Sequence, residues 1–348
     1  MLVNSRAAKT AVLLAAMVAA GAACSSASID EDAPIAQAST NTAATSTAGA
    51  ASRGAPGNVK VAHKGCSSGK APKTHDARTV TMGTTARKYQ FDAPANWPAG
   101  KPIPLVLALH PLLLNGSQMR VLAKFEAKIT PERPFMVVYP DGIGNSWNAG
   151  ECCGDAKDQK VDDVAFVKKI LDDLEDELCV DETRVYSTGF SNGGFLSHRL
   201  ACEMTDRFAA IAAVAGTLGI PEASCKPSRP IAVLQIHGDQ DPLVPIDGGS
   251  PQIPLIGKTF GTFQAPQASV DFWRGHDRAG TPAQIFQKGS TLCMGAAGTG
   301  GTDVTYCRIT GGGHQWPGTE ALPAMGPQTK DIDATETVLN FLFLHQMP

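Results

Sequence analysis

One stretch, Gly189-Phe190-Ser191-Asn192-Gly193, is the strongest indication of how this chain folds. It matches the pattern G-x-S-x-G. The residues before it, 184–188, are typical of a strand, and residues 194–204 after it are typical of a helix. A serine on such a sharp turn from strand to helix has its hydroxyl exposed at the end of a sheet, and flanking glycines permit the close backbone approach that the turn requires. The stretch therefore predicts a nucleophile elbow with Ser191 as the nucleophile.

Strand-like and helix-like segments alternate from about residue 78 to the C-terminus. Short apolar runs, typical of strands buried on both faces, occur at 104–109, 135–139, 208–214, 231–236 and 304–309, after two early strands at 79–84 and 89–92. Apolar residues at helical spacing predict a helix over 164–178, and a D-x-x-E pattern at 333–336 predicts a last helix through Leu344. The alternation predicts an α/β fold, a mostly parallel sheet with helices on both faces, whose ligands bind at the carboxyl ends of the strands.

Ser191 needs a general base and an acid that orients the base, because a serine hydroxyl is a weak nucleophile at neutral pH. In a fold with this elbow, the three residues follow in the order Ser, Asp or Glu, His. Asp241 follows a predicted strand and is the expected acid, with Asp239 as its rival and Asp247 as a weaker one. His314 is the expected base, since three preceding glycines let the backbone turn tightly and carry the imidazole over the edge of the sheet.

An oxyanion hole beside Ser191 needs two preorganised N–H donors. The backbone N–H of Asn192 is the first expected donor, because this residue directly follows the nucleophile at the start of a helix. The second donor is expected in the loop after the predicted strand 104–109. Pro111 has no N–H, so Leu112 is the nearest candidate and Leu113 the next.

Three large apolar side chains near these residues are candidates for lining a pocket for an acyl or aryl group. They are Trp316, two residues after His314, together with Trp147 and Leu113. Each could equally belong to the core, and the sequence leaves both alternatives open.

Several ordered segments together resemble the family of α/β-hydrolase esterases that contains polyhydroxybutyrate depolymerase-like and feruloyl esterase-like enzymes. The resemblance runs from about residue 80 to the C-terminus and includes segments 152–154, 161–164, 188–194, 200–203, 208–216, 237–245 and 312–318. It implies an α/β-hydrolase fold, serine esterase chemistry and no metal or other cofactor. The sequence departs from the family at His110-Pro111, where relatives usually have His-Gly, so the second oxyanion donor and the pocket shape stay open. Nothing in the sequence selects among polyester, feruloyl and acetyl esters.

The first 58 residues predict export and a tether rather than part of the fold. Residues 1–23 have a basic start, a short apolar run and small residues before Cys24, which is typical of a signal peptide and resembles a lipoprotein box. Either Cys24 is lipidated, or cleavage near Ala23 releases a free enzyme. Residues 24–58 are rich in Ala, Ser, Thr and Gly and predict a flexible tether, which leaves 59–348 as the catalytic domain. We expect either a secreted protein or a lipoprotein at the cell surface or outer membrane of a bacterial envelope. Contact with a membrane is expected only through the lipid anchor.

Charge and cysteine content narrow the class further. The 348 residues carry a formal net charge of −3, which gives no electrostatic reason to expect nucleic acid as a partner. Eight of the nine cysteines remain when Cys24 is set aside, and an even number predicts four disulfides in an oxidising compartment, with Cys293 and Cys307 as one pair. No C-x-x-C spacing suggests zinc. Two other functions stay open, namely a catalytically silent surface protein that binds polymer or carbohydrate, and a peptidase on the same fold.

Overall fold

The structure, a computed structural model, describes residues 64–97, 100–252 and 261–348. All of these belong to one unit, Ala62–Pro348. The predicted signal peptide 1–23, the tether 24–58 and Cys24 lie outside the described residues, so those expectations stay predictions. The described residues contain no helix that is long and apolar enough to cross a membrane.

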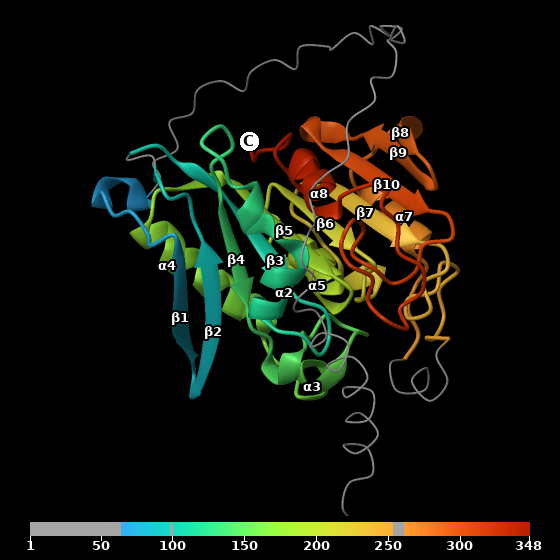
Figure 1. Cartoon of the computed structure of the whole chain (residues 1–348), viewed down its shortest axis with the longest axis horizontal. Coiled ribbons are helices and arrows are strands. Elements are labelled where there is room, and N and C mark those ends of the chain that lie inside the picture. Colours follow the sequence, from blue (N-terminus) through green and yellow to red (C-terminus); the bar gives the residue numbers. More distant parts are fainter. Residues whose placement is uncertain (1–63, 98–99, 253–260) are drawn as a thin grey trace, which may run out of the picture. The chain divides into compact units, whose positions relative to one another are not determined.

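The described residues form a ten-stranded sheet with the strand order β1-β2-β4-β3-β5-β6-β7-β10-β9-β8, which Figure 1 shows from β1 at one edge to β8 at the other. The six central strands, from β4 to β10 in this order, run parallel, and the two strands at each edge are antiparallel. The bounds are β1 His75–Met82, β2 Thr85–Asp92, β3 Ile103–Leu109, β4 Met136–Pro140, β5 Val180–Phe190, β6 Ala210–Val214, β7 Ala232–Gly238, β8 Ala283–Lys288, β9 Thr291–Ala297 and β10 Asp303–Ile309.

Helices cover both faces of this sheet. The bounds are α2 Gly116–Ala123, α3 Gly154–Asp158, α4 Asp163–Glu177, α5 Asn192–Glu203, α7 Pro266–His276 and α8 Ala334–Leu342. Side chains of α4, α5 and α7 share one buried cluster, and those of α2 and α8 share a second. Alternate residues of β3 enter the two clusters, Leu107 the first and Ala108 the second, as expected for a strand buried on both faces.

The predicted architecture is confirmed as an α/β-hydrolase arrangement. Each apolar run predicted as a strand overlaps an observed strand, and all three predicted helices are present as α4, α5 and α8. The last helix begins as predicted, because Asp333 accepts a hydrogen bond from the N–H of Glu336 at 3.1 Å, but it ends at Leu342 rather than Leu344. The hairpin of β8 and β9 was not predicted from the sequence.

The eight described cysteines that were expected to pair form four disulfides, namely Cys66–Cys179, Cys152–Cys153, Cys202–Cys225 and Cys293–Cys307. The predicted pair Cys293–Cys307 is confirmed. It joins directly opposite positions of β9 and β10 in the antiparallel register. This number of disulfides is typical of an exported protein.

Candidate active site

Ser191 lies between the end of β5 and the start of α5, as a nucleophile elbow requires. Its φ of 52° and ψ of −119° lie in a region that side-chain-bearing residues rarely adopt. The Ser191 N–H donates to the Val214 carbonyl at 2.8 Å, which fixes the turn against β6. A Cβ on Gly193 would collide with the Leu109 carbonyl oxygen, so only glycine allows α5 to begin this close to the end of β3. Ser191 itself remains partly exposed.

The structure brings Asp241 and His314 together from distant parts of the chain. Asp241 Oδ2 lies 2.7 Å from His314 Nδ1, and both side chains are buried. Asp241 Oδ1 accepts two backbone hydrogen bonds at 2.8 Å, from the N–H groups of Leu243 and Val244. An ionised carboxylate only accepts, so His314 Nδ1 carries the proton of this contact, and Nε2 is the nitrogen with the lone pair in the neutral ring.

The carboxyl of Asp241 is ionised at neutral pH. Burial alone would raise its pKa, but the nearby imidazole of His314, their hydrogen bond and the imidazole of His237 together hold the pKa below its ordinary value. A carboxylate in this state can orient an imidazole and stabilise the imidazolium that forms when the imidazole takes up a proton.

The loop that carries His314 is held in place by the segment 325–327. The Gly313 N–H donates to the Pro327 carbonyl at 2.8 Å, and the His314 N–H donates to the Met325 carbonyl at 2.6 Å. On its other side, the His314 ring centroid lies 5.0 Å from that of Phe190, the residue before Ser191. The imidazole therefore lies beside the elbow.

Asp239, the rival for the acid, has other partners. Its Oδ2 forms an ion pair with Arg308 at 3.0 Å, and its Oδ1 accepts the Gly311 N–H at 2.7 Å. It thus fastens the start of the glycine loop to β10. Asp247 is exposed. Of the three aspartates, Asp241 is the one with a contact to His314 in the described part of the chain.

Asn192 is fully buried at the first position of α5, where a backbone N–H has no acceptor within the helix. Its side chain is held by the backbone of Trp147, which donates to Asn192 Oδ1 at 2.7 Å and accepts from Nδ2 at 3.0 Å. The second donor was left open between Leu112 and Leu113. Because the Leu113 N–H donates to the Asn145 carbonyl at 2.8 Å, Leu112 is the better candidate.

Trp147 and Trp316 are both 0% exposed, which favours the core alternative over pocket lining for each. The indole of Trp147 donates to the His110 carbonyl at 2.9 Å, and that of Trp316 donates to Thr335 Oγ1 at 3.0 Å. Both rings are thus enclosed by protein and support the walls of the site. Leu113 is partly exposed and keeps the pocket-lining alternative.

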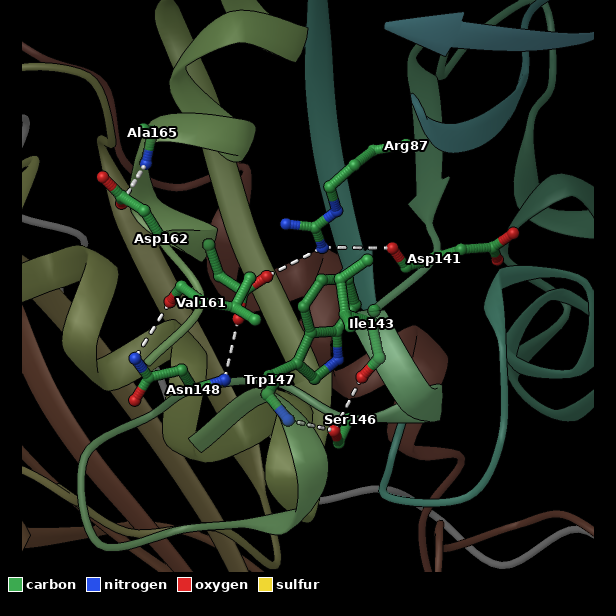
Figure 2. Close-up of polar contacts among 12 residues, drawn as sticks. Arg87, Asp141, Ile143, Ser146, Trp147, Asn148, Val161, Asp162 and Ala165 are labelled. Carbon is green, nitrogen blue, oxygen red and sulfur yellow. Dashed lines mark hydrogen bonds and ion pairs between the residues drawn. The ribbon is translucent and has the colours of Figure 1, made fainter. Parts of the chain in front are cut away.

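A buried ion pair between Arg87 and Asp163 was not singled out from the sequence. The Arg87 Nη2 atom lies 2.7 Å from Asp163 Oδ1 and donates to the Asp141 carbonyl at 3.2 Å, while Asp163 Oδ2 accepts the Asn148 N–H at 2.8 Å. Figure 2 shows Arg87 and its contact with the Asp141 carbonyl beside the indole of Trp147. The pair therefore fastens both ends of the segment 141–148 that holds the side chain of Asn192. Arg87 lies in β2, next to the edge strand of the sheet, and nothing in the local sequence indicates that it is buried.

Burial is the largest cause of the pKa shifts in this region. It lowers the pKa of Arg87 and raises that of Asp163, with each partner opposing the shift of the other. It also lowers the pKa of His110 to about 4, and this ring is neutral with Nε2 accepting the Gly142 N–H at 2.9 Å. Among the described residues, no group of three or more His, Cys, Asp or Glu side chains is placed to hold a metal ion.

Comparison with known proteins agrees with this fold. The model of the prolyl oligopeptidase family (Peptidase_S9) matches residues 122–243, which include Ser191 and Asp241. "Putative esterase NocK" of Nocardia uniformis subsp. tsuyamanensis is 31% identical over 297 residues, 78% of this chain and 83% of that protein. Feruloyl esterase B of Piromyces equi is 33% identical over 236 residues, 66% of this chain but only 42% of that protein.

Solved structures show the same fold at low sequence identity. The acetyl xylan esterase from Aspergillus awamori has a TM-score of 0.53 and 13% identity over 77% of this chain and 99% of that chain. A thermostable esterase also has a TM-score of 0.53, with 19% identity over 78% of this chain and 63% of that chain. The fold and the elbow define an α/β-hydrolase. Together with the similarity to NocK, they show that the chain belongs to the family of α/β-hydrolase esterases that contains NocK.

Proposed function

We propose that this chain is a serine esterase that hydrolyses carboxylic esters through a triad of Ser191, His314 and Asp241. The observation that carries the proposal is the 2.7 Å contact between His314 Nδ1 and Asp241 Oδ2 beside the elbow. This contact orients the imidazole and leaves Nε2 free to take the proton of a serine hydroxyl. Family membership supports the same class of reaction.

The reaction proceeds by two acyl transfers. Ser191 Oγ attacks the ester carbonyl while His314 Nε2 takes its proton, and the resulting imidazolium, stabilised by Asp241, returns the proton to the leaving alcohol. Water, activated by the same imidazole, then cleaves the acyl-enzyme. The backbone N–H groups of Asn192 and Leu112 bind the negative oxygen that forms in each step. No step requires a cofactor.

Feruloyl esters are the substrates we place first, because several of the relatives are named feruloyl esterases. Polyhydroxyalkanoate-type polyesters and acetyl esters follow. The direct comparison uses methyl ferulate, acetylated xylan, a polyhydroxybutyrate film and a short aryl ester. The highest kcat/KM on methyl ferulate would support the order, and turnover of the polyester film alone would reverse it.

Ser191→Ala tests the chemistry itself. Removing the nucleophile is expected to lower kcat on a short aryl ester by several powers of ten, because the triad acts as a unit. Ser250→Ala is the matched control, since this serine is exposed and outside the triad, and we expect it to keep full activity. Turnover of the Ser191→Ala variant at the level of the unmodified enzyme would overturn the proposed mechanism.

Two alternatives can be separated by simple measurements. A peptidase is favoured by the match to the prolyl oligopeptidase family and would hydrolyse an amide at a rate comparable with the matching ester. A silent binding protein for polymer or carbohydrate would not react with a fluorophosphonate. We expect ester turnover well above amide turnover and covalent labelling of Ser191.

The proposal extends to where the enzyme works. Export through residues 1–23 fits the four disulfides, and attachment through a lipid on Cys24 would place the enzyme on a membrane surface. Cys24→Ser should then shift the enzyme from the membrane fraction to the medium. An unchanged distribution would favour the free secreted form.

A further inference from the structure

A series of buried polar contacts runs along one face of the sheet from α7 to the carboxylate of the triad. Hydrogen bonds join Trp273 on α7, through His198 on α5, to Gln235 and His237 on β7, and His237 Nε2 lies 3.4 Å from Asp241 Oδ2. These five side chains are at most 3% exposed. Only Asp241 has a role in the proposed triad, so the other four need a physical explanation.

The first links have a fixed direction. An indole N–H can only donate, so the 2.9 Å contact between Trp273 Nε1 and His198 Nδ1 makes that nitrogen an acceptor. The proton of the neutral His198 ring is then on Nε2, which donates to Gln235 Oε1 at 3.1 Å. Burial lowers the pKa of His198 to about 4, and the ring is therefore neutral at the pH values where esterases are assayed.

The direction continues to the triad. With its oxygen facing His198, the Gln235 amide presents Nε2 to the Gly216 carbonyl at 2.9 Å and to His237 Nδ1 at 3.4 Å. His237 Nδ1 therefore accepts, and its proton is on Nε2. That nitrogen lies 2.8 Å from the Val244 carbonyl and 3.4 Å from Asp241 Oδ2.

Asp241 Oδ2 thus lies between two imidazoles, His314 at 2.7 Å and His237 at 3.4 Å. The His237 ring is neutral because burial lowers its pKa more than the nearby carboxylate raises it. If its proton were on Nδ1 instead, the Nε2 lone pair would face two acceptors, the Val244 carbonyl and the carboxylate. The donor chain removes this unfavourable arrangement and directs the Nε2–H to the Val244 carbonyl, beside the carboxylate of Asp241.

The same chain also contacts the backbone behind the nucleophile. Gln235 Nε2 holds the Gly216 carbonyl, and Gly216 approaches the Ser191 carbonyl so closely that a Cβ on Gly216 would lie 2.6 Å from it. One buried amide therefore links the segment behind the elbow with the imidazole that faces the acid of the triad. This is the arrangement expected of a support that keeps the two in register.

We propose that His237 is a positioning residue of the esterase. Its Nε2–H holds the carbonyl of Val244, whose own N–H donates to Asp241 Oδ1, and faces the Asp241 carboxylate at 3.4 Å, while Gln235, His198 and Trp273 fix the direction of that N–H. The proposal rests on the proposed function, since it assigns a role to the support of the same triad. It concerns kcat rather than substrate binding, because none of these buried residues is exposed to a substrate.

Two variants of equal length at position 237 test the proposal. His237→Met removes the N–H, whereas His237→Gln places an amide nitrogen near the position of Nε2 and can still donate. We expect His237→Met to lower kcat on a short aryl ester about tenfold with KM within twofold, as for the loss of one buried hydrogen bond, and His237→Gln to recover most of the loss. A merely structural role would instead lower the melting temperature and the amount of active enzyme similarly in both variants.

Equal kcat for the Met and Gln variants, each normalised to the sites that react with a fluorophosphonate, would overturn the proposal. Trp273→Phe provides a test that does not alter the site and removes only the first donor of the chain. We expect its kcat to fall about two- to fivefold at unchanged KM. A kcat equal to that of the unmodified enzyme would also count against the proposed role of the hydrogen bonds from Trp273 to His237. An unmodified enzyme without ester turnover or fluorophosphonate labelling would instead overturn the proposed function.

Discussion

Arg87→Met should destabilise this protein far more than the loss of an ion pair on its surface. Arg87 and Asp163 lie 2.7 Å apart with side chains that are 3% and 0% exposed. The guanidinium of Arg87 also stacks on Phe166, with Cζ 3.7 Å from the ring centroid. Methionine keeps the apolar length of the arginine stem but leaves the carboxylate of Asp163 buried without its cation. The variant therefore removes the guanidinium with its contacts and keeps the packing of the stem.

The expected loss follows from these contacts. Breaking a buried pair by removing one partner costs about 3–5 kcal/mol, and the Asp141 carbonyl that loses its donor adds about 1 kcal/mol. We expect the free energy of unfolding to fall by about 4–6 kcal/mol at pH 7. Lys168→Met is the matched control, because Lys168 lies 2.6 Å from Asp172 with a side chain that is 60% exposed. Its loss should stay below about 1 kcal/mol.

The effect of Arg87→Met should also depend on pH. Burial raises the pKa of Asp163, and Arg87 opposes this shift, so the pKa rises further in the variant. The pKa of Asp163 is higher in the folded than in the unfolded protein. Deprotonation of the buried carboxyl therefore lowers the stability as pH rises from the unfolded pKa to the folded pKa, and the full stability is present below the unfolded pKa. The difference between the variant and the unmodified protein should therefore be smaller at pH 4 than at pH 7.

The assay is urea unfolding followed by tryptophan fluorescence and circular dichroism at both pH values. The double variant Arg87→Met with Asp163→Asn should be more stable than Arg87→Met at pH 7, because it contains no unpaired buried charge. A loss for Arg87→Met no larger than that for Lys168→Met, or a loss independent of pH, would refute this explanation of how the segment 141–148 is held.

Three further predictions concern the elbow, the buried imidazoles and one disulfide. Gly193→Ala should abolish ester turnover, because a Cβ there collides with the end of β3, and an active variant would contradict the described elbow. Burial lowers the pKa of His110 and of His198 from 6.5 to about 4, so the unfolded chain binds more protons in this window. The free energy of unfolding should therefore fall, by up to about 3 kcal/mol per ring, between pH 6.5 and 4, and a flat profile in urea melts would contradict this. Replacing Cys66 and Cys179 by Ala opens a loop with a sequence separation of 113 and should cost about 4–5 kcal/mol in the same assay, whereas a loss below about 1 kcal/mol would contradict the chain-entropy explanation.

The parts of the fold that sequence could predict are those whose local pattern and tertiary role agree. Strand β3 is apolar because it is buried on both faces, and the glycines of the elbow are needed where α5 meets the end of β3. The order of Ser191, Asp241 and His314 indicated a site at the ends of the strands, and two of these side chains are in direct contact.

The rest depends on packing that a local pattern does not contain. All six residues of β8 are exposed, so this edge strand has no alternation of buried and exposed positions, and its pairing comes from β9. Arg87 looks like a solvent-facing charge in the sequence, yet it is buried because Asp163 arrives from another element. Trp316 follows the predicted base by two residues, but only the position of Thr335 and its neighbours decides that the ring belongs to the core.

The most direct test of the triad is the structure of the protein after reaction with a fluorophosphonate. The proposed mechanism predicts phosphorus bonded to Ser191 Oγ, a phosphoryl oxygen within hydrogen-bond distance of the Asn192 and Leu112 N–H groups, and His314 Nε2 facing the adduct. Labelling of another residue, or an imidazole of His314 turned away from a modified Ser191, would contradict it.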